Sequence, residues 1–203
     1  MLTLIAGIAE ELGVAVNHEL AAYRHKVFVE ALGWDLPLVE DGKEYDRFDR
    51  PDTLYIIAKD DRGTICGCAR LLPTTKMYLL KELSPELMNG LPPPCSPEVW
   101  ELSRFTTKTA DASITLSKDE ARRRFCILFA AVVRTALDHG AVRLITFTAM
   151  GVERILRSIG LHTHRVGPPR MIDGQPILAL WIELDHQTLA ALELPVEGIV
   201  KVS

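Results

Sequence analysis

The chain has 203 residues, of which 48% are hydrophobic and 25% are charged, and its net charge is -4. This composition is typical of one soluble globular domain spanning residues 1–203, and it excludes a disordered or fibrous chain. No apolar run reaches the ~18 residues that a membrane-spanning helix needs, and the N-terminus lacks the basic start of a signal peptide. We therefore expect a cytoplasmic protein without membrane contact.

Charge is unevenly distributed along the chain. Residues 118–170 contain ten basic and four acidic residues, so this segment is basic within an acidic protein. Such a segment favours an acidic partner, although a solvated face is the commoner explanation. Nucleic acid is not the expected partner, because the segment has no recognisable binding motif and no interleaved aromatic residues.

Cysteine and histidine spacings predict no metal site. Cys66 and Cys68 share one face of an expected strand, and no C-x-x-C pair occurs. His162 and His164 also share a strand face, but two imidazoles alone do not complete a site. We expect all four cysteines to be buried as small hydrophobic residues.

The first half of the chain predicts a helix followed by a hairpin. A helix is expected from His18 to Leu32, with Asn17 as its cap and Gly33 as its end. Residues 34–52 are acidic and carry few signals for regular structure. The apolar runs 53–59 and 64–72, joined by the sequence DDRG, predict a β-hairpin.

The second half alternates strands and helices. After a Pro-rich stretch with one short helix at 73–97, a strand is expected at 99–105. Ser117 and Glu120 form a capping box that opens a long helix ending before Gly140. Further strands are expected at 142–149, 161–167 and 175–184, with a helix at 151–159. This order predicts an α+β fold or an α/β fold, the latter a three-layer α/β/α sandwich with a mixed sheet.

The strand at 97–106, PEVWELSRFT, places charges in an apolar pattern. Side chains alternate in a strand, so Glu101 and Ser103 are expected on one face and Arg104 on the other. One interpretation is a structural ion pair across a bulge. The other is a catalytic carboxylate held in a charged cluster.

Three polar groups stand out along the chain: Arg24, Phe28 and Trp34; Asp46 and Asp49; and Arg70, Glu101 and Arg104. In the order of these groups, the chain resembles the LuxI-type autoinducer synthase family, the acyl-homoserine-lactone synthases. The resemblance is carried by the motifs YRHKVFVEALGW, EYDRFDRPDTLYI, GCARLLPT, VWELSRF and TFTAMGVERILRSIG. The match covers nearly the whole sequence.

The resemblance implies an N-acetyltransferase-like fold and a two-step reaction without a cofactor. The amine of S-adenosylmethionine, a substrate, attacks the thioester of an acyl-acyl-carrier-protein. Its carboxylate then displaces the sulfonium, which closes the lactone and releases methylthioadenosine. The implied site comprises Glu101, Ser103 and Arg104 for catalysis, and Arg24, Phe28, Trp34, Asp46, Asp49, Arg70 and Phe105 for S-adenosylmethionine.

Physical chemistry supports these residue types. Phe28 and Trp34 offer aromatic faces to the sulfonium cation. Asp46 and Asp49 suit the substrate ammonium, and they are also placed to form ion pairs with the arginines. Glu101 is the expected base that removes the amine proton, directly or through water.

Two further surfaces follow from the resemblance. The acyl-chain pocket is expected to include Leu102, Leu128, Thr146, Thr148 and Met150, with Thr148 favouring a 3-oxo chain. The acidic carrier protein is expected to dock on Arg154, Arg157, Arg165 and Arg170 of the basic segment.

Two alternatives remain open. The first is a coenzyme A-dependent N-acetyltransferase, although residues 91–139 contain no glycine for the usual pyrophosphate-binding loop before a helix. The second is a ligand-binding module without activity, which only a turnover assay separates from an enzyme.

Overall fold

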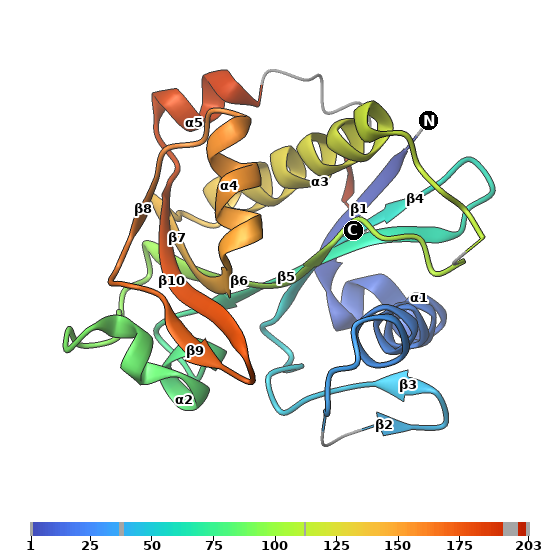
Figure 1. Cartoon of the computed structure of the whole chain (residues 1–203). Coiled ribbons are helices and arrows are strands. Elements are labelled where there is room, and N and C mark those ends of the chain that lie inside the picture. The colour runs from blue at the N-terminus through green and yellow to red at the C-terminus, as the bar shows by residue number, and fades with distance from the viewer. Residues whose placement is uncertain (1, 37–38, 112, 193–198, 202–203) are drawn as a thin grey trace. The chain divides into compact units, whose positions relative to one another are not determined.

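The computed structural model describes residues 2–36, 39–111, 113–192 and 199–201 (Figure 1). The chain divides into two units. The first unit comprises Met1–Arg70, Arg104–Val132 and Pro195–Ser203. The second comprises Leu71–Ser103 and Val133–Leu194. Three elements contribute residues to both units, namely the strands β5 (Ile65–Pro73) and β6 (Val99–Thr106) and the helix α3 (Lys118–Asp138).

The first unit is built on strands in the order β11-β1-β4-β5-β6. Strand β1 (Thr3–Ile8) pairs in parallel with β11 (Ile199–Lys201) and antiparallel with β4 (Leu54–Lys59). The predicted hairpin of β4 and β5 is confirmed, and the N–H of Gly63 in its turn donates to the Asp60 carbonyl. A separate two-stranded hairpin, β2 (Val39–Glu40) and β3 (Lys43–Glu44), lies within the irregular acidic stretch.

The first helix begins earlier than predicted. Helix α1 spans Ala9–Arg24 and continues as a π-helix, η1, over His25–Ala31. Gly13 interrupts α1 with a φ of 75°, and the Asn17 amide donates to the Ala9 and Gly13 carbonyls instead of capping a helix start. Asn17 does not cap a helix start, because its side-chain amide donates instead to carbonyls that lack a helical partner at this kink. The predicted end is confirmed, since Gly33 has a φ of 69°.

Helix α3 keeps the predicted bounds but only half of the predicted capping box. The Glu120 N–H donates to Ser117 Oγ at 3.2 Å. The Glu120 carboxylate instead accepts from Arg124 Nε at 2.8 Å, one turn along the helix. Gly140, just beyond the end of α3, has the positive φ expected there.

Within the second unit the strand order is β5-β6-β7-β10-β8, with β9 also paired to β10. Strand β7 (Arg143–Ala149) runs parallel to β6 and antiparallel to β10 (Gln175–Glu183). The strand predicted at 161–167 is reduced to β8 (Thr163–Arg165), and β9 (Arg170–Ile172) was not predicted. The helical elements are α2 (Leu79–Leu83), the 3-10 helix η2 (Pro85–Met88), α4 (Met150–Ser158) and α5 (His186–Ala191).

Each unit therefore combines parallel and antiparallel strand pairs, which confirms an α/β fold with a mixed sheet. Across the described ranges, no helix is both long and apolar enough to cross a membrane. Cys66, Cys68 and Cys126 are buried as expected, whereas Cys95 is exposed, so the expectation for that residue is wrong.

Candidate active site

Three buried arginines and three acidic residues form a charge cluster in the first unit. Its members are Arg24, Arg70, Arg104, Glu44, Asp46 and Asp49, hereafter the charge cluster. Arg70 donates to Asp46 at 2.7 and 2.9 Å and to Asp49 at 2.8 Å. Arg104 Nη2 donates to Glu44 and to Asp46, each at 2.9 Å. The cluster thus contains equal numbers of guanidinium and carboxylate groups, which compensates charge removed from water.

Arg24 completes the cluster from helix α1. Its Nε donates to Glu44, and its Nη1 donates to Asp49 at 2.8 Å. The ion pairs expected between Asp46, Asp49 and the three arginines are therefore confirmed. The helix supplies Arg24, whereas the acidic residues come from β3 and the loop that follows it.

Glu44 is the cluster member that the sequence analysis missed. Its side chain is fully buried and accepts from both Arg24 and Arg104. A signal was present, because Glu44 lies two residues before Asp46 and positions i and i+2 share a side in an extended segment. Tyr55 was missed as well, and its hydroxyl donates to Asp49 Oδ1 at 2.8 Å.

Asp49 stays ionised because of its neighbours. Burial alone acts to raise the pKa of this carboxyl, but the Arg24 and Arg70 charges outweigh burial and hold its pKa well below the ordinary value. Burial and the Asp49 charge together raise the pKa of the Tyr55 hydroxyl far above its ordinary value. Tyr55 is therefore a hydrogen-bond donor to Asp49 throughout the physiological pH range.

The two predicted aromatic residues lie beside Arg104. The rings of Phe28 and Trp34 stack with centroids 4.8 Å apart and planes at 27°. The Arg104 guanidinium carbon lies 5.5 Å from each ring centroid, within the range of a cation–π contact. Phe28 is 2% exposed and Trp34 is 42% exposed, so the stack leads from the core to the surface.

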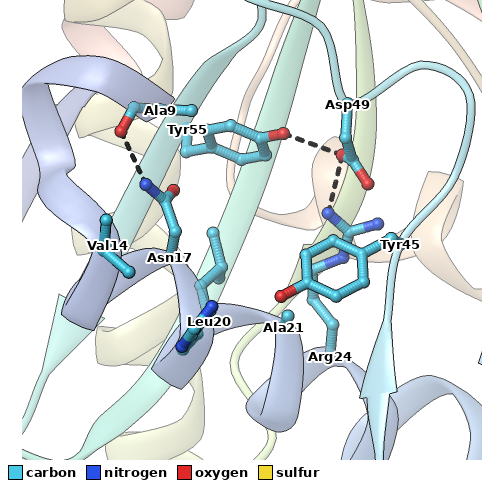
Figure 2. Close-up of a pocket in the computed structure, with 10 residues that line it drawn as sticks. Ala9, Val14, Asn17, Leu20, Ala21, Arg24, Tyr45, Asp49 and Tyr55 are labelled. Atoms are coloured by element: carbon cyan, nitrogen blue, oxygen red, sulfur yellow. Dashed lines mark hydrogen bonds and ion pairs between the residues drawn. The ribbon is translucent and has the colours of Figure 1, made fainter. Parts of the chain in front are cut away.

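A pocket of about 310 Å³ opens on another side of the charge cluster. Figure 2 shows Arg24 and Asp49 in its lining together with Tyr45, Tyr55 and Asn17. Neither Phe28 nor Trp34 lines this pocket. The pocket and the aromatic stack are thus two different approaches to the cluster.

Strand β6 has buried residues in both of its alternating sets of side chains. Val99 and Glu101 are buried, and then Leu102, Arg104 and Thr106 are buried. Arg104 has a φ of 51°, a left-handed conformation that costs a non-glycine residue about 1–3 kcal/mol. The buried positions Leu102, Arg104 and Thr106 alternate, which agrees with the expected placement of Arg104 on the face opposite Glu101 and Ser103, and its side chain contacts Glu44 and Asp46.

Glu101 lies in the second unit and is fully buried. Its Oε2 accepts the Leu79 N–H at 2.8 Å and its Oε1 accepts the Leu80 N–H at 2.7 Å. Both amides belong to the first turn of α2, where N–H groups lack partners within the helix. The Glu101 carboxylate therefore accepts hydrogen bonds from the start of α2.

The described pairing of strands β6 and β7 ends at Glu101. Their pairing in the described residues runs from Val99–Arg143 to Glu101–Ile145. Ser103, Leu102, Thr146, Thr148 and Met150 all follow the last pair, within the second unit. Leu128 is fully buried on α3 in the first unit. Four of the five expected acyl-chain residues therefore follow the last described pair of β6 and β7 along their chains.

The remaining predicted residues have other neighbours. Phe105 packs on Phe125 and Phe129, with centroids 4.9 and 5.4 Å away. Arg154 and Arg157 are exposed on α4, and Arg165 is exposed on β8. Arg165 donates to the buried Glu153 at 2.8 and 2.7 Å, and Arg157 pairs with the same carboxylate at 3.2 Å. Two of the expected docking arginines therefore share one acidic partner. Arg170 is exposed on β9.

Comparisons with known proteins agree on one family. The family model for autoinducer synthases matches residues 10–192. The chain is 50% identical to an acyl-homoserine-lactone synthase of Ralstonia solanacearum over 182 residues, which is 89% of this chain and 88% of that protein. The solved structure of TofI, in a ternary complex with an inhibitor and MTA, is 43% identical with a TM-score of 0.83 and covers 96% of this chain and 98% of that chain.

Two solved structures with lower sequence identity have a similar fold. BjaI, a CoA-dependent acyl-homoserine lactone synthase solved with MTA, is 25% identical with a TM-score of 0.82, covering 98% of this chain and 90% of that chain. A Lactobacillus plantarum protein described as an N-acetyltransferase is 18% identical with a TM-score of 0.59, which shows a likeness of fold alone. The expected N-acetyltransferase-like fold is confirmed. With its family match over residues 10–192, the chain belongs to the autoinducer synthase family and is an acyltransferase of the acyl-homoserine-lactone synthase class.

Proposed function

We propose that this enzyme makes an N-acyl-L-homoserine lactone from S-adenosylmethionine and an acyl-acyl-carrier-protein. The substrate amine forms a bond to the thioester carbonyl carbon, the carbon–sulfur bond breaks, and the carrier thiol leaves. The substrate carboxylate then forms a bond to the carbon next to the sulfonium. The electron pair of the broken bond passes to sulfur, and neutral methylthioadenosine leaves.

The observation that carries this proposal is the aromatic stack beside the buried charge cluster. A sulfonium is a cation with apolar substituents, so the Phe28 and Trp34 rings suit it better than a carboxylate would. The relatives TofI and BjaI were solved with MTA, which is consistent with a site for this part of the substrate. No cofactor is required in the proposed reaction, because every bond change occurs between the two substrates.

Glu101 is our proposed general base for the amine. An ammonium has no lone pair, so a proton must leave before attack. The contacts of Glu101 with the Leu79 and Leu80 amides hold the carboxylate in one orientation, which is a requirement for a base that works through a bound water. Ser103, which follows Glu101 by two residues, is the proposed second polar group on the acyl side.

Coenzyme A is the competing carrier of the acyl group, because a CoA-dependent acyl-homoserine lactone synthase, BjaI, is among the similar structures. Two observations favour a carrier protein. Exposed arginines gather on α4, β8 and β9, and acyl-carrier proteins are acidic. The sequence also has no glycine at 91–139, where a phosphate-binding loop would precede α3. Free cysteines and these substrates are consistent with a cytoplasmic enzyme, which we also propose.

Turnover with matched acyl donors tests the proposal. The purified enzyme is given S-adenosylmethionine with one acyl chain on the carrier protein, on coenzyme A or on pantetheine. The lactone and methylthioadenosine are measured by mass spectrometry. We expect kcat/KM for the carrier thioester to exceed the other two by at least about tenfold, because only the carrier offers an extended acidic protein surface to the exposed arginines. Equal or faster turnover of the coenzyme A thioester would reassign the donor, and no lactone from any donor would refute the reaction.

A further inference from the structure

The charge cluster is rich in donors, and every carboxylate oxygen of its acidic residues is already engaged. Each of the six carboxylate oxygens of Glu44, Asp46 and Asp49 already accepts at least one hydrogen bond. In contrast, Arg24 Nη2 and Arg104 Nε are buried, and neither has a hydrogen-bond partner in the described part of the chain. Buried donors without an acceptor are unusual and costly. The cluster as it stands is suited to an incoming anion.

The donors and acceptors of the charge cluster determine how well it can bind the ammonium group of the substrate. An ammonium group is a donor only, so in this cluster it has to share carboxylate oxygens that already accept hydrogen bonds. A carboxylate, which is an acceptor only when ionised, adds a partner without breaking an existing ion pair. S-adenosylmethionine carries both groups. Its carboxylate is therefore the part that the cluster recognises most readily.

Arg104 is the better placed of the two arginines. Only its Nη2 is committed to the acidic residues, whereas Arg24 uses both Nε and Nη1. The Arg104 guanidinium is equidistant from the Phe28 and Trp34 centroids, so it flanks the stack instead of covering one ring. Trp34, at 42% exposure, is the most solvent-accessible of the three side chains and gives a ligand its approach.

We propose that Arg104 binds the carboxylate of S-adenosylmethionine through Nε, beside the aromatic stack that holds the sulfonium. The inference rests on the proposed function, which makes this molecule the substrate. Three carbons join the carboxylate to the sulfonium sulfur, so one short chain reaches both groups. Arg104 then holds the oxygen nucleophile of lactone closure while the amide forms. Its primary contact in the active site is then the substrate.

Binding measurements without an acyl donor test this role. Calorimetry compares S-adenosylmethionine with decarboxylated S-adenosylmethionine, which keeps the amine and the sulfonium but lacks the carboxylate. We expect the wild type to bind the complete molecule about tenfold to a hundredfold more tightly, as a buried charged hydrogen bond predicts. Arg104→Lys keeps the positive charge but loses Nε and the planar fork, so its preference should fall to about threefold or less.

Arg143→Lys is the matched control. Arg143 also lies over a tryptophan, 4.7 Å from the Trp181 centroid, and pairs with Glu183 at 2.6 Å, but it lies outside the charge cluster. This variant should keep the wild-type preference. Arg24→Lys, which changes the second unpartnered arginine, should also keep most of it. Circular dichroism and thermal unfolding confirm that each variant is folded.

The outcomes are separable. A wild-type preference near one overturns the inference without any variant, so the test does not depend on Arg104→Lys folding. A preference retained in Arg104→Lys, or lost in Arg24→Lys alone, also overturns it. If the wild type makes lactone yet shows no preference, only this inference fails. If it neither binds S-adenosylmethionine nor makes lactone, the proposed function fails as well.

Discussion

Arg104 shows how one residue combines backbone strain with a polar role. Its φ of 51° is unfavourable for an arginine, yet its side chain reaches two buried carboxylates and two aromatic rings. The charge-assisted hydrogen bonds offset the backbone cost, since each contributes about 1.5–3 kcal/mol. The strain therefore persists because the surrounding contacts select this conformation.

For Glu101, the prediction separates catalysis from helix capping. Glu101→Gln should lower kcat for amide formation by about two to four orders of magnitude, as loss of a general base does. The kinetic loss should greatly exceed any change in the unfolding temperature. A purely structural role would instead lower activity together with the unfolding temperature.

Glu98→Gln is the control for this change. Glu98 lies three residues earlier in the same segment and is exposed, so its variant should keep wild-type activity. Near-native turnover of a folded Glu101→Gln enzyme would show that another group is the base.

Thr148 carries a prediction about the acyl chain. Thr146 and Thr148 share one face of β7, opposite Leu180 and Leu178 of β10. A hydroxyl donates to a 3-oxo group, so Thr148→Val should reduce kcat/KM for 3-oxoacyl donors about tenfold and leave unsubstituted donors unchanged. Thr135→Val, at a buried position on α3, should change neither. Competition assays with paired acyl donors measure the ratio, and an unaltered ratio in Thr148→Val would rule out this contact.

Among the elements, α4 carries the docking prediction. Glu153 is a buried residue of this helix that pairs with both Arg157 and Arg165, and its hydrogen bonds with Arg165 lower the pKa of the Glu153 carboxyl. Arg154 is the exposed α4 arginine for which the described residues show no carboxylate contact within ion-pair distance. Its charge is therefore the most available to an acidic carrier protein.

Arg154→Glu should raise KM for the acyl-carrier-protein about three- to tenfold and leave KM for S-adenosylmethionine unchanged. The effect should shrink as salt is raised, because the Debye length is already only ~8 Å at physiological ionic strength. Arg134→Glu, the same charge change on the exposed face of α3, is the control. Steady-state kinetics at two salt concentrations decide the matter. A wild-type KM for the carrier in Arg154→Glu, or equal effects of both variants, would place docking elsewhere.

For the whole molecule, the charge cluster predicts how stability depends on pH. The pKa of Asp49 is lower in the folded state than in the unfolded chain, because Arg24 and Arg70 favour its ionised form. Its contribution to the free energy of unfolding is therefore complete above the unfolded pKa of about 4 and is lost as the pH falls toward the folded pKa. Acid should thus unfold the wild type progressively from about pH 4 downward.

Asp49→Asn should be less stable at pH 7 by about 3–5 kcal/mol, since two buried arginines lose a charged partner. Its stability should also fall less steeply than that of the wild type below pH 4, because the titrating group is absent. Asp52→Asn, which removes a more exposed partner of Arg50, should cost less than about 1 kcal/mol and keep the wild-type slope. Urea unfolding from pH 2 to 7 measures all three. Parallel curves for wild type and Asp49→Asn would contradict the assignment.

Local signals explain which elements were predictable. The hairpin of β4 and β5, the bounds of α3 and the position of α4 all depend on residues within a few positions of each element, such as Gly63, Ser117 and Gly160. The ion pairs of Asp46 and Asp49 were also predictable, because carboxylates need positively charged partners and the arginines are visible in the sequence. By itself, the sequence thus determined the mixed α/β fold, the family and most members of the charge cluster.

Only the tertiary structure decided the contacts between distant segments. Glu101 and Leu79 are 22 positions apart, and Arg104 and Glu44 are 60 apart, so no local pattern relates them. Strand β1 was not predicted, and it is placed by pairing with β4 and β11. The early start of α1 depends on Gly13 and on a side-chain contact of Asn17. The physical reason is common to all of these. The topology of the chain determines which buried polar groups come close together. Because water is excluded there, each group must form its hydrogen bonds with those protein neighbours.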